Sequence, residues 1–196
     1  MDKEQKPAVK QKKSKGQIVV CIICSIIIVA AVLMLAGYMI LERHGRKEIE
    51  KVTDSFISSL NNKSGTELYG LLSDEYINYM GTEYGYSKLD VIKEMESSLA
   101  FFQGNIEAEN GYDLGPLEEI SVYDNDAEDF DTDELSEMKA YFRNELDMVI
   151  EDYAQVNLKC HVRGEKRKIK MLLELYLYKI NEKWYFLDWY WVGLEE

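Results

Sequence analysis

Residues 18–41 form a run of 24 positions without a charged side chain, and this run constrains the chain more than any other feature. Ile, Val, Leu, Ala and Met dominate it. A helix of that length measures roughly 36 Å, enough to cross a hydrocarbon core of roughly 30 Å. A helix that is apolar on all sides would need a far larger soluble protein around it. The sequence therefore predicts a single transmembrane helix over 18–41.

A cleavable signal peptide is the main alternative to a permanent anchor. Its apolar region spans about 7–15 residues and ends at a small-residue cleavage site. Here the run is longer and ends in Tyr38–Leu41, with Ala36-Gly37 as a weak cleavage candidate. Cys21 and Cys24 come too early to be lipoprotein-type cysteines, so we interpret them as helix-packing residues, with palmitoylation as the alternative.

The flanking charges predict the orientation of this helix. Residues 1–17 carry six lysines, whereas the other flank carries Arg43, Arg46, Lys47 and Lys51. The flank richer in Lys and Arg stays in the cytoplasm, and long domains translocate largely regardless of charge. We therefore expect a cytoplasmic tail over 1–17, a linker over 42–46 and an extracellular domain over 47–196, held at the cell membrane.

The charges divide unevenly between these parts. The chain has 23 Lys and Arg against 36 Asp and Glu, of which six and two lie in residues 1–17. Residues 42–196 therefore hold 17 basic and 34 acidic residues, a net charge of −17. A domain this acidic repels phosphate, which argues against nucleic-acid binding. It is compatible with a cation or a basic protein partner, and also with charge that serves solubility alone.

Cys160 is the only cysteine of residues 42–196, so no intramolecular disulfide can form there. A hydrophobic core must stabilise the outer domain, and about 150 residues can supply one. An exported domain so poor in cysteine is typical of a bacterial cell surface rather than of a secreted eukaryotic protein.

Apolar residues recur at three- and four-residue steps through much of the outer domain, which predicts amphipathic helices. The expected helices span 47–60, 66–79 and 88–103, the last with Ser87 as its N-cap, and a fourth begins with Thr132 or Asp133 as its cap and ends near Leu146. Between the third and fourth, residues 117–123 have the composition of a strand.

Strict alternation of apolar and polar residues marks the last third of the chain. It predicts three strands over 155–162, 169–177 and 184–192, joined by short turns into an antiparallel meander. Helices followed by such a sheet favour an α+β domain, with the helices packed on one face of a curved antiparallel sheet.

The last strand is apolar on both of its predicted faces. Period two places Trp184, Phe186, Tyr190 and Val192 on one face and Tyr185, Leu187, Trp189 and Trp191 on the other. One face can cover the helices, and the second would be exposed in a two-layer monomer. Tyr and Trp are favoured at interfaces, so we expect a binding surface that includes Trp184, Tyr185, Trp189, Tyr190 and Trp191.

The helices, the long meander and the closing Lys183–Asp188 resemble the nuclear-transport-factor-2-like, or cystatin-like, superfamily over roughly residues 46–193. A tail, one membrane helix and an outer domain of this type are similar to uncharacterised exported proteins of Gram-positive bacteria. More distantly, the layout resembles membrane-anchored scaffolds of conjugation and type IV secretion machines. These resemblances imply protein assembly, although the superfamily also contains isomerases and dehydratases.

Candidates for catalysis are few. Cys160 alternates onto the apolar strand face, His161 falls on the polar face, and a nucleophile or base needs an open pocket and a partner. The superfamily's isomerases use an Asp, His or Tyr in a cone-shaped pocket, a role that the resemblance opens to Asp188 and several tyrosines here. Nothing in the sequence places a second partner beside Asp188, and a surface position is the favoured interpretation of it. We favour a binding role over an enzymatic one.

Acidic residues gather between Asp124 and Glu134. Carboxylates are the ligands that calcium takes, so Asp124, Asp126, Asp129 and Asp131 are weak calcium candidates. The spacing lacks the Gly and Glu that an EF-hand loop requires, so a solvated acidic loop before a helix is the favoured interpretation.

Together these features predict a membrane-anchored, extracytoplasmic binding or assembly module without a required cofactor. Its aromatic sheet face would bind a protein partner, a second copy of itself or a small apolar ligand. An isomerase-like enzyme and a calcium-responsive module are the alternatives.

Overall fold

Four long antiparallel strands form the sheet of this protein, in the order β1-β2-β3-β4. The computed structural model describes residues 45–108 and 114–195. The strands are β1 (Leu117–Asp129), β2 (Asp152–Gly164), β3 (Lys168–Ile180) and β4 (Lys183–Glu195). Consecutive strands pair with each other, so the predicted meander is confirmed and β1 extends it by one strand.

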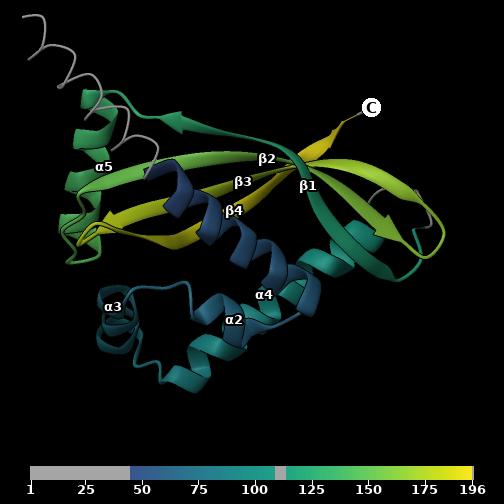
Figure 1. Ribbon diagram of the computed structural model, residues 1–196. Helices are drawn as coiled ribbons and strands as arrows, with labels where there is room; N and C mark the ends of the chain where they lie inside the picture. Colours follow the sequence, from purple (N-terminus) through teal and green to yellow (C-terminus); the bar gives the residue numbers. More distant parts are fainter. Residues whose placement is uncertain (1–44, 109–113, 196) are drawn as a thin grey trace, which may run out of the picture. The chain divides into compact units, whose positions relative to one another are not determined.

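In chain order most of the helices precede β1, and one lies between β1 and β2 (Figure 1). Residues 45–62 are helical, and we call residues 47–62 of this stretch the first helix. It is followed by α2 (Gly65–Tyr69), α3 (Asp74–Tyr84), α4 (Lys88–Ala108) and, after β1, α5 (Thr132–Glu145). The predicted α+β class is therefore confirmed. Residues Lys47–Glu196 form one compact unit.

The predicted membrane helix over 18–41 lies outside the described residues. Within 45–108 and 114–195, no helix combines the length and the apolar character needed to cross a membrane.

Two hydrophobic clusters lie on opposite faces of the sheet. The larger packs the first helix, α2 and α4 against inward residues such as Leu158, Leu173 and Leu175. The smaller joins α5 and the segment after it to Tyr153 and Tyr178 on the other face. The expectation that all helices cover one face was wrong, because the apolar side of α5 meets strand residues that alternate outward from the main core.

A break divides the helix that was predicted over 66–79. Gly70 ends α2, and Ser73 begins α3 by accepting a hydrogen bond from the backbone N–H of Tyr76 at 3.1 Å. The buried Ser73 hydroxyl also accepts a hydrogen bond from the Tyr178 hydroxyl at 2.9 Å. A side chain that caps a helix and bonds to the sheet explains why the chain turns here rather than continuing as one helix.

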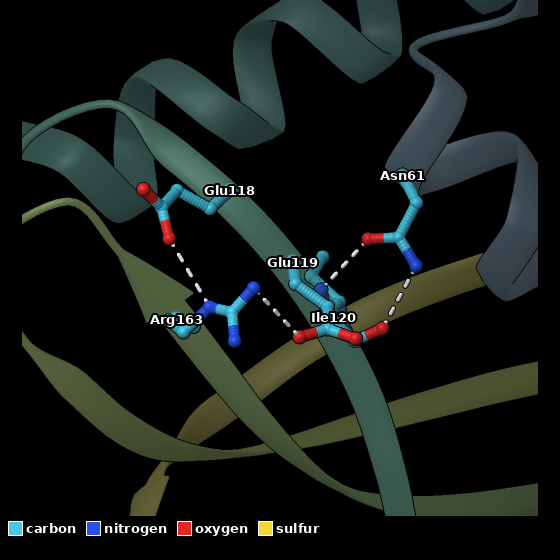
Figure 2. Close-up of polar contacts among 5 residues, drawn as sticks. All are labelled: Asn61, Glu118, Glu119, Ile120 and Arg163. Atoms are coloured by element: carbon cyan, nitrogen blue, oxygen red, sulfur yellow. Dashed lines mark hydrogen bonds and ion pairs between the residues drawn. The ribbon is translucent and has the colours of Figure 1, made fainter.

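Both sheet edges are partly closed by other elements. At β1, the Asn61 amide donates to the carbonyl of Ile120 at 2.8 Å and accepts from its N–H at 2.7 Å (Figure 2). Arg163 of β2 pairs with Glu118 and Glu119 beside this contact. At β4, the N–H of Phe186 donates to the carbonyl of Leu71 at 2.9 Å. Such contacts occupy backbone groups that an edge strand would otherwise leave unpaired.

Candidate functional site

A bulge in β4 decides which of its aromatic residues share a face. Phe186 pairs with Leu177, but Asp188 pairs with Tyr176, the residue before Leu177, so Leu187 has no partner in the ladder. One extra residue in a strand inverts the alternation that follows it. Trp184, Phe186, Trp189 and Trp191 therefore all face the larger cluster.

This bulge corrects the predicted binding face. Trp189 packs against Phe102 of α4 and Phe56 of the first helix, with ring centroids 4.4 and 5.6 Å away. Trp184 is buried in the same cluster. Tyr185 and Tyr190 lie on the opposite face, Tyr185 stacked on Tyr178 and Tyr190 against Tyr176. The five predicted residues divide between the two faces differently than expected, with Trp184, Trp189 and Trp191 on one face and Tyr185 and Tyr190 on the other.

Two adjoining grooves flank β4 at the bulge, and they share Ser98, Asp188, Trp189 and Tyr190. The first, of about 450 Å³, lies between α4 and β4, and Phe101, 71% exposed, stands at its rim. The second, of about 530 Å³, lies among α3, α4, α5 and the sheet. Volumes of this size suit small ligands, which proteins hold in clefts of about 300–1,000 Å³.

Tyrosines from five elements converge on the second groove. They are Tyr76 of α3, Tyr141 of α5, Tyr153 of β2, Tyr176 of β3 and Tyr190 of β4. The rings of Tyr153 and Tyr176 stack at 6.2 Å, and Tyr176 meets Tyr190 edge-on at 5.6 Å. Met95, Met138 and Leu146 complete the apolar wall.

Asp188 is the only charged residue that lines either groove within the described part of the chain. Its carboxylate accepts hydrogen bonds from the Tyr190 hydroxyl at 2.8 Å and from the N–H of Trp189 at 2.8 Å. The bond from Tyr190 raises the pKa of that tyrosine. Burial, together with the hydrogen bond to Glu174, raises the pKa of Tyr176 to about 12. At neutral pH Tyr176 and Tyr190 therefore stay protonated and can donate hydrogen bonds.

Searches against protein-family models, curated proteins and solved structures found no match to this chain. Function must therefore be inferred from the residues of the two grooves.

Two of the three candidates for catalysis, Cys160 and His161, lie outside the grooves. Cys160 is buried, and burial raises the pKa of its thiol to about 12, which disfavours the reactive thiolate. His161 stacks on Tyr123 of β1, with ring centroids 4.4 Å apart. Asp188 does lie in a groove, but it is exposed rather than enclosed in an apolar pocket.

The acidic segment is a strand and not the expected loop. β1 continues to Asp129, Asp124 pairs with Lys159 at 2.9 Å, and the side chain of Asp129 lies outside the described part. Asp131, rather than Thr132 or Asp133, caps α5, and its carboxylate accepts from the N–H groups of Asp133 and Glu134. Among the described residues, no three His, Cys, Asp or Glu side chains converge as a metal site would require.

Substitutions of Asp131 distinguish its role as a helix cap from a role in calcium binding. We expect Asp131→Ala to lower the free energy of unfolding by about 1 kcal/mol, because two N–H groups at the start of α5 lose their acceptor. Asp131→Asn should cost much less, since Asn also caps helices. Urea unfolding in calcium and in chelator measures both. An Ala variant as stable as the parent, or a loss that appears only in calcium, would contradict the capping role.

Sequence reasoning missed most of the residues that line the grooves. Ser97, Ser98 and Asn105 are polar helix positions, and Tyr76, Tyr141, Tyr153 and Tyr176 come from four separate elements. Phe101 did carry a signal, because it lies beside the core residue Phe102 and so falls outside the apolar stripe of its helix.

Proposed function

We propose that this chain is a membrane-anchored, extracytoplasmic binding module, and that it takes its ligand in the two grooves at the β4 bulge. The observation that carries the proposal is the set of aromatic side chains left exposed around concave surfaces. Phe101, Tyr141 and Tyr190 belong to the exposed large hydrophobic residues of the described part of the chain, and all three line the grooves. Exposed aromatic groups around a concavity are typical of binding sites.

The membrane anchor would hold the grooves at the outer surface of the cell. This part of the proposal rests on the uncharged run over 18–41 and on the lysines before it. We also propose a relationship to the nuclear-transport-factor-2-like superfamily. Its support is the set of helices packed against an antiparallel sheet that ends in Lys183–Asp188.

A protein partner is the second candidate ligand. Tyr190 and Val192 are exposed on β4, which is an edge strand of the sheet, and Phe101 is exposed on α4 nearby. An extended segment of another chain could add to such an edge and place side chains in the first groove. Isomerase-type catalysis is less favoured, because Asp188 is exposed and not enclosed in an apolar pocket.

Photo-cross-linking in intact cells tests the binding role directly. A benzophenone amino acid replaces Phe101 at the groove rim, and the same group replaces Leu89 as the control. Leu89 is also exposed and lies on α4, about 18 Å away along the helix, without lining either groove.

We expect clearly higher adduct yields at position 101 than at position 89, because position 101 lines a groove and position 89 does not. Intact-mass analysis of the full chain then separates a small ligand from a protein partner by the added mass. Equal yields at the two positions would argue that the grooves are not the binding site.

A further inference from the structure

The second groove combines electron-rich rings with a single negative charge. Within the described residues, the side chains that line it include five tyrosines, one carboxylate and no Lys, Arg or His. A cation above an aromatic face is attracted by the ring quadrupole, and the attraction strengthens when the site excludes water. The groove thus offers two sources of attraction for a positive group and no repulsion from its own lining.

Tyrosines elsewhere in the chain already have a cation over their rings. Lys88 lies 5.0 Å from the ring centroid of Tyr69, Lys183 lies 4.8 Å from that of Tyr185, and Lys170 lies 5.8 Å from that of Tyr123. No such contact involves the groove tyrosines among the residues that the structure describes. Their ring faces are left without a cation although lysines cover other tyrosines of the same molecule.

Hydrogen bonds polarise two of the groove tyrosines in the favourable direction. The Tyr190 hydroxyl donates to Asp188 and the Tyr176 hydroxyl donates to Glu174, each at 2.8 Å. Donation to an anion increases the electron density of the phenol ring, because hydrogen-bonded groups polarise one another. The negative potential at the ring faces that a cation would contact is therefore increased.

We propose that the second groove binds a small organic cation, an ammonium group that carries methyl or larger apolar substituents. Asp188 supplies the counter-charge, Tyr176 and Tyr190 supply ring faces, and Met95 and Met138 contact the apolar substituents. The net charge of −17 on residues 42–196 attracts such a cation at longer range. This inference rests on the proposed binding role of the grooves and names the class of ligand.

The test compares choline with 3,3-dimethyl-1-butanol, a neutral alcohol of the same shape, on the full chain in a maltoside detergent. All three tryptophans of the protein lie in β4, so intrinsic fluorescence reports on the grooves. We expect saturable binding of choline at least about tenfold tighter than that of the alcohol, because the Asp188 carboxylate and the tyrosine rings both attract the charge that the alcohol lacks. Nα-acetyl-lysine N-methylamide keeps the free ammonium group of a lysine side chain and models a basic peptide. It should bind more weakly than choline, because its ammonium group is strongly hydrated.

Variants assign the binding to the groove. Asp188→Asn and Tyr190→Leu should each weaken choline binding at least about fivefold, whereas Tyr190→Phe, which keeps the ring, should stay within about threefold. Asp126→Asn removes the same charge from β1, at the other edge of the sheet, and should leave choline binding unchanged. If Asp126→Asn and Asp188→Asn weakened choline binding equally, the overall negative charge of the domain and not the groove would attract the cation, and the inference would be overturned.

The outcomes also separate this inference from the proposed function. If Tyr190→Leu weakens the alcohol and choline equally, the groove binds apolar ligands without regard to charge, and only the inference fails. Tighter binding of Nα-acetyl-lysine N-methylamide than of choline would overturn it in favour of a basic peptide. If no probe binds, the inference also fails, and adducts at position 101 decide whether the proposed function survives.

Discussion

Trp189→Ser is expected to lower the free energy of unfolding by about 3 kcal/mol, whereas Tyr190→Ser should lower it by less than about 1 kcal/mol. The two positions are adjacent in sequence, but the bulge places them on opposite faces of β4. Trp189 joins the main cluster between Phe56 and Phe102. Removing its ring leaves a void between two helices and the sheet, and the remaining Ser hydroxyl faces apolar neighbours.

Tyr190 is a matched control because it is also aromatic and lies one residue away. Its side chain is 55% exposed, and its contacts are the ring of Tyr176 and the carboxylate of Asp188. Urea unfolding of the full chain, followed by circular dichroism rather than by tryptophan fluorescence, measures both variants. The reverse order of stabilities would show that β4 alternates without interruption and that Trp189 faces outward.

The same bulge explains why the fold was easier to predict than the site. Alternation over 155–162 and 169–177 placed Leu158, Leu173 and Leu175 correctly, because no extra residue interrupts those segments between them. In β4 the alternation was correct as far as Phe186 and inverted after Leu187. Leu187, an apolar residue between Phe186 and Asp188, gives no sign of a bulge in the sequence. With or without the bulge, β4 has aromatic residues on each face, so the pattern does not distinguish the two arrangements.

Local sequence signals also failed where long-range contacts decide the structure. The apolar spacing of Leu68, Leu71 and Leu72 favoured one helix, but the bond between Ser73 and Tyr178, 105 residues apart, selects a break. The acids of β1 disfavour a strand locally, yet ladder pairing with β2 extends it to Asp129. The second groove takes residues from five elements, and only the packed structure brings them together.

The free energy of unfolding is expected to fall steeply at alkaline pH, because buried tyrosine hydroxyls and a buried cysteine thiol must keep their protons in the folded state. Burial raises the pKa of the Tyr178 hydroxyl above the ordinary value of 10.0, even though its hydrogen bonds with Ser73 act in the opposite direction. Burial alone raises the pKa of Cys160 from 9.0 to about 12. Tyr153, Tyr176 and Tyr76 shift in the same direction, with burial as the first cause of each shift.

The sign of the effect follows from which state releases protons first. Below about pH 8 both groups are protonated in both states, and their contribution to stability is fully present. Above pH 10 the unfolded chain loses the two protons while the folded chain keeps them, so stability falls by about 1.4 kcal/mol per pH unit for each group. The combined slope from Tyr178 and Cys160 approaches 3 kcal/mol per unit only at about pH 11, where the unfolded phenol is ionised and the folded thiol still keeps its proton, and it is large against a total of about 5–15 kcal/mol.

Urea midpoints measured on the full chain from pH 8 to pH 11.5 test this dependence. Tyr178→Phe should be less stable than the parent at pH 8, because Ser73 loses its hydrogen-bond partner, but its stability should fall less steeply above pH 10. Cys160→Ala should also reduce the slope, beginning about one pH unit lower, since an unfolded thiol ionises before a phenol. Tyr123→Phe removes an exposed tyrosine hydroxyl and serves as the control. If both buried variants kept the parent slope, the alkaline unfolding would have to come from repulsion among surface charges, which salt would then suppress.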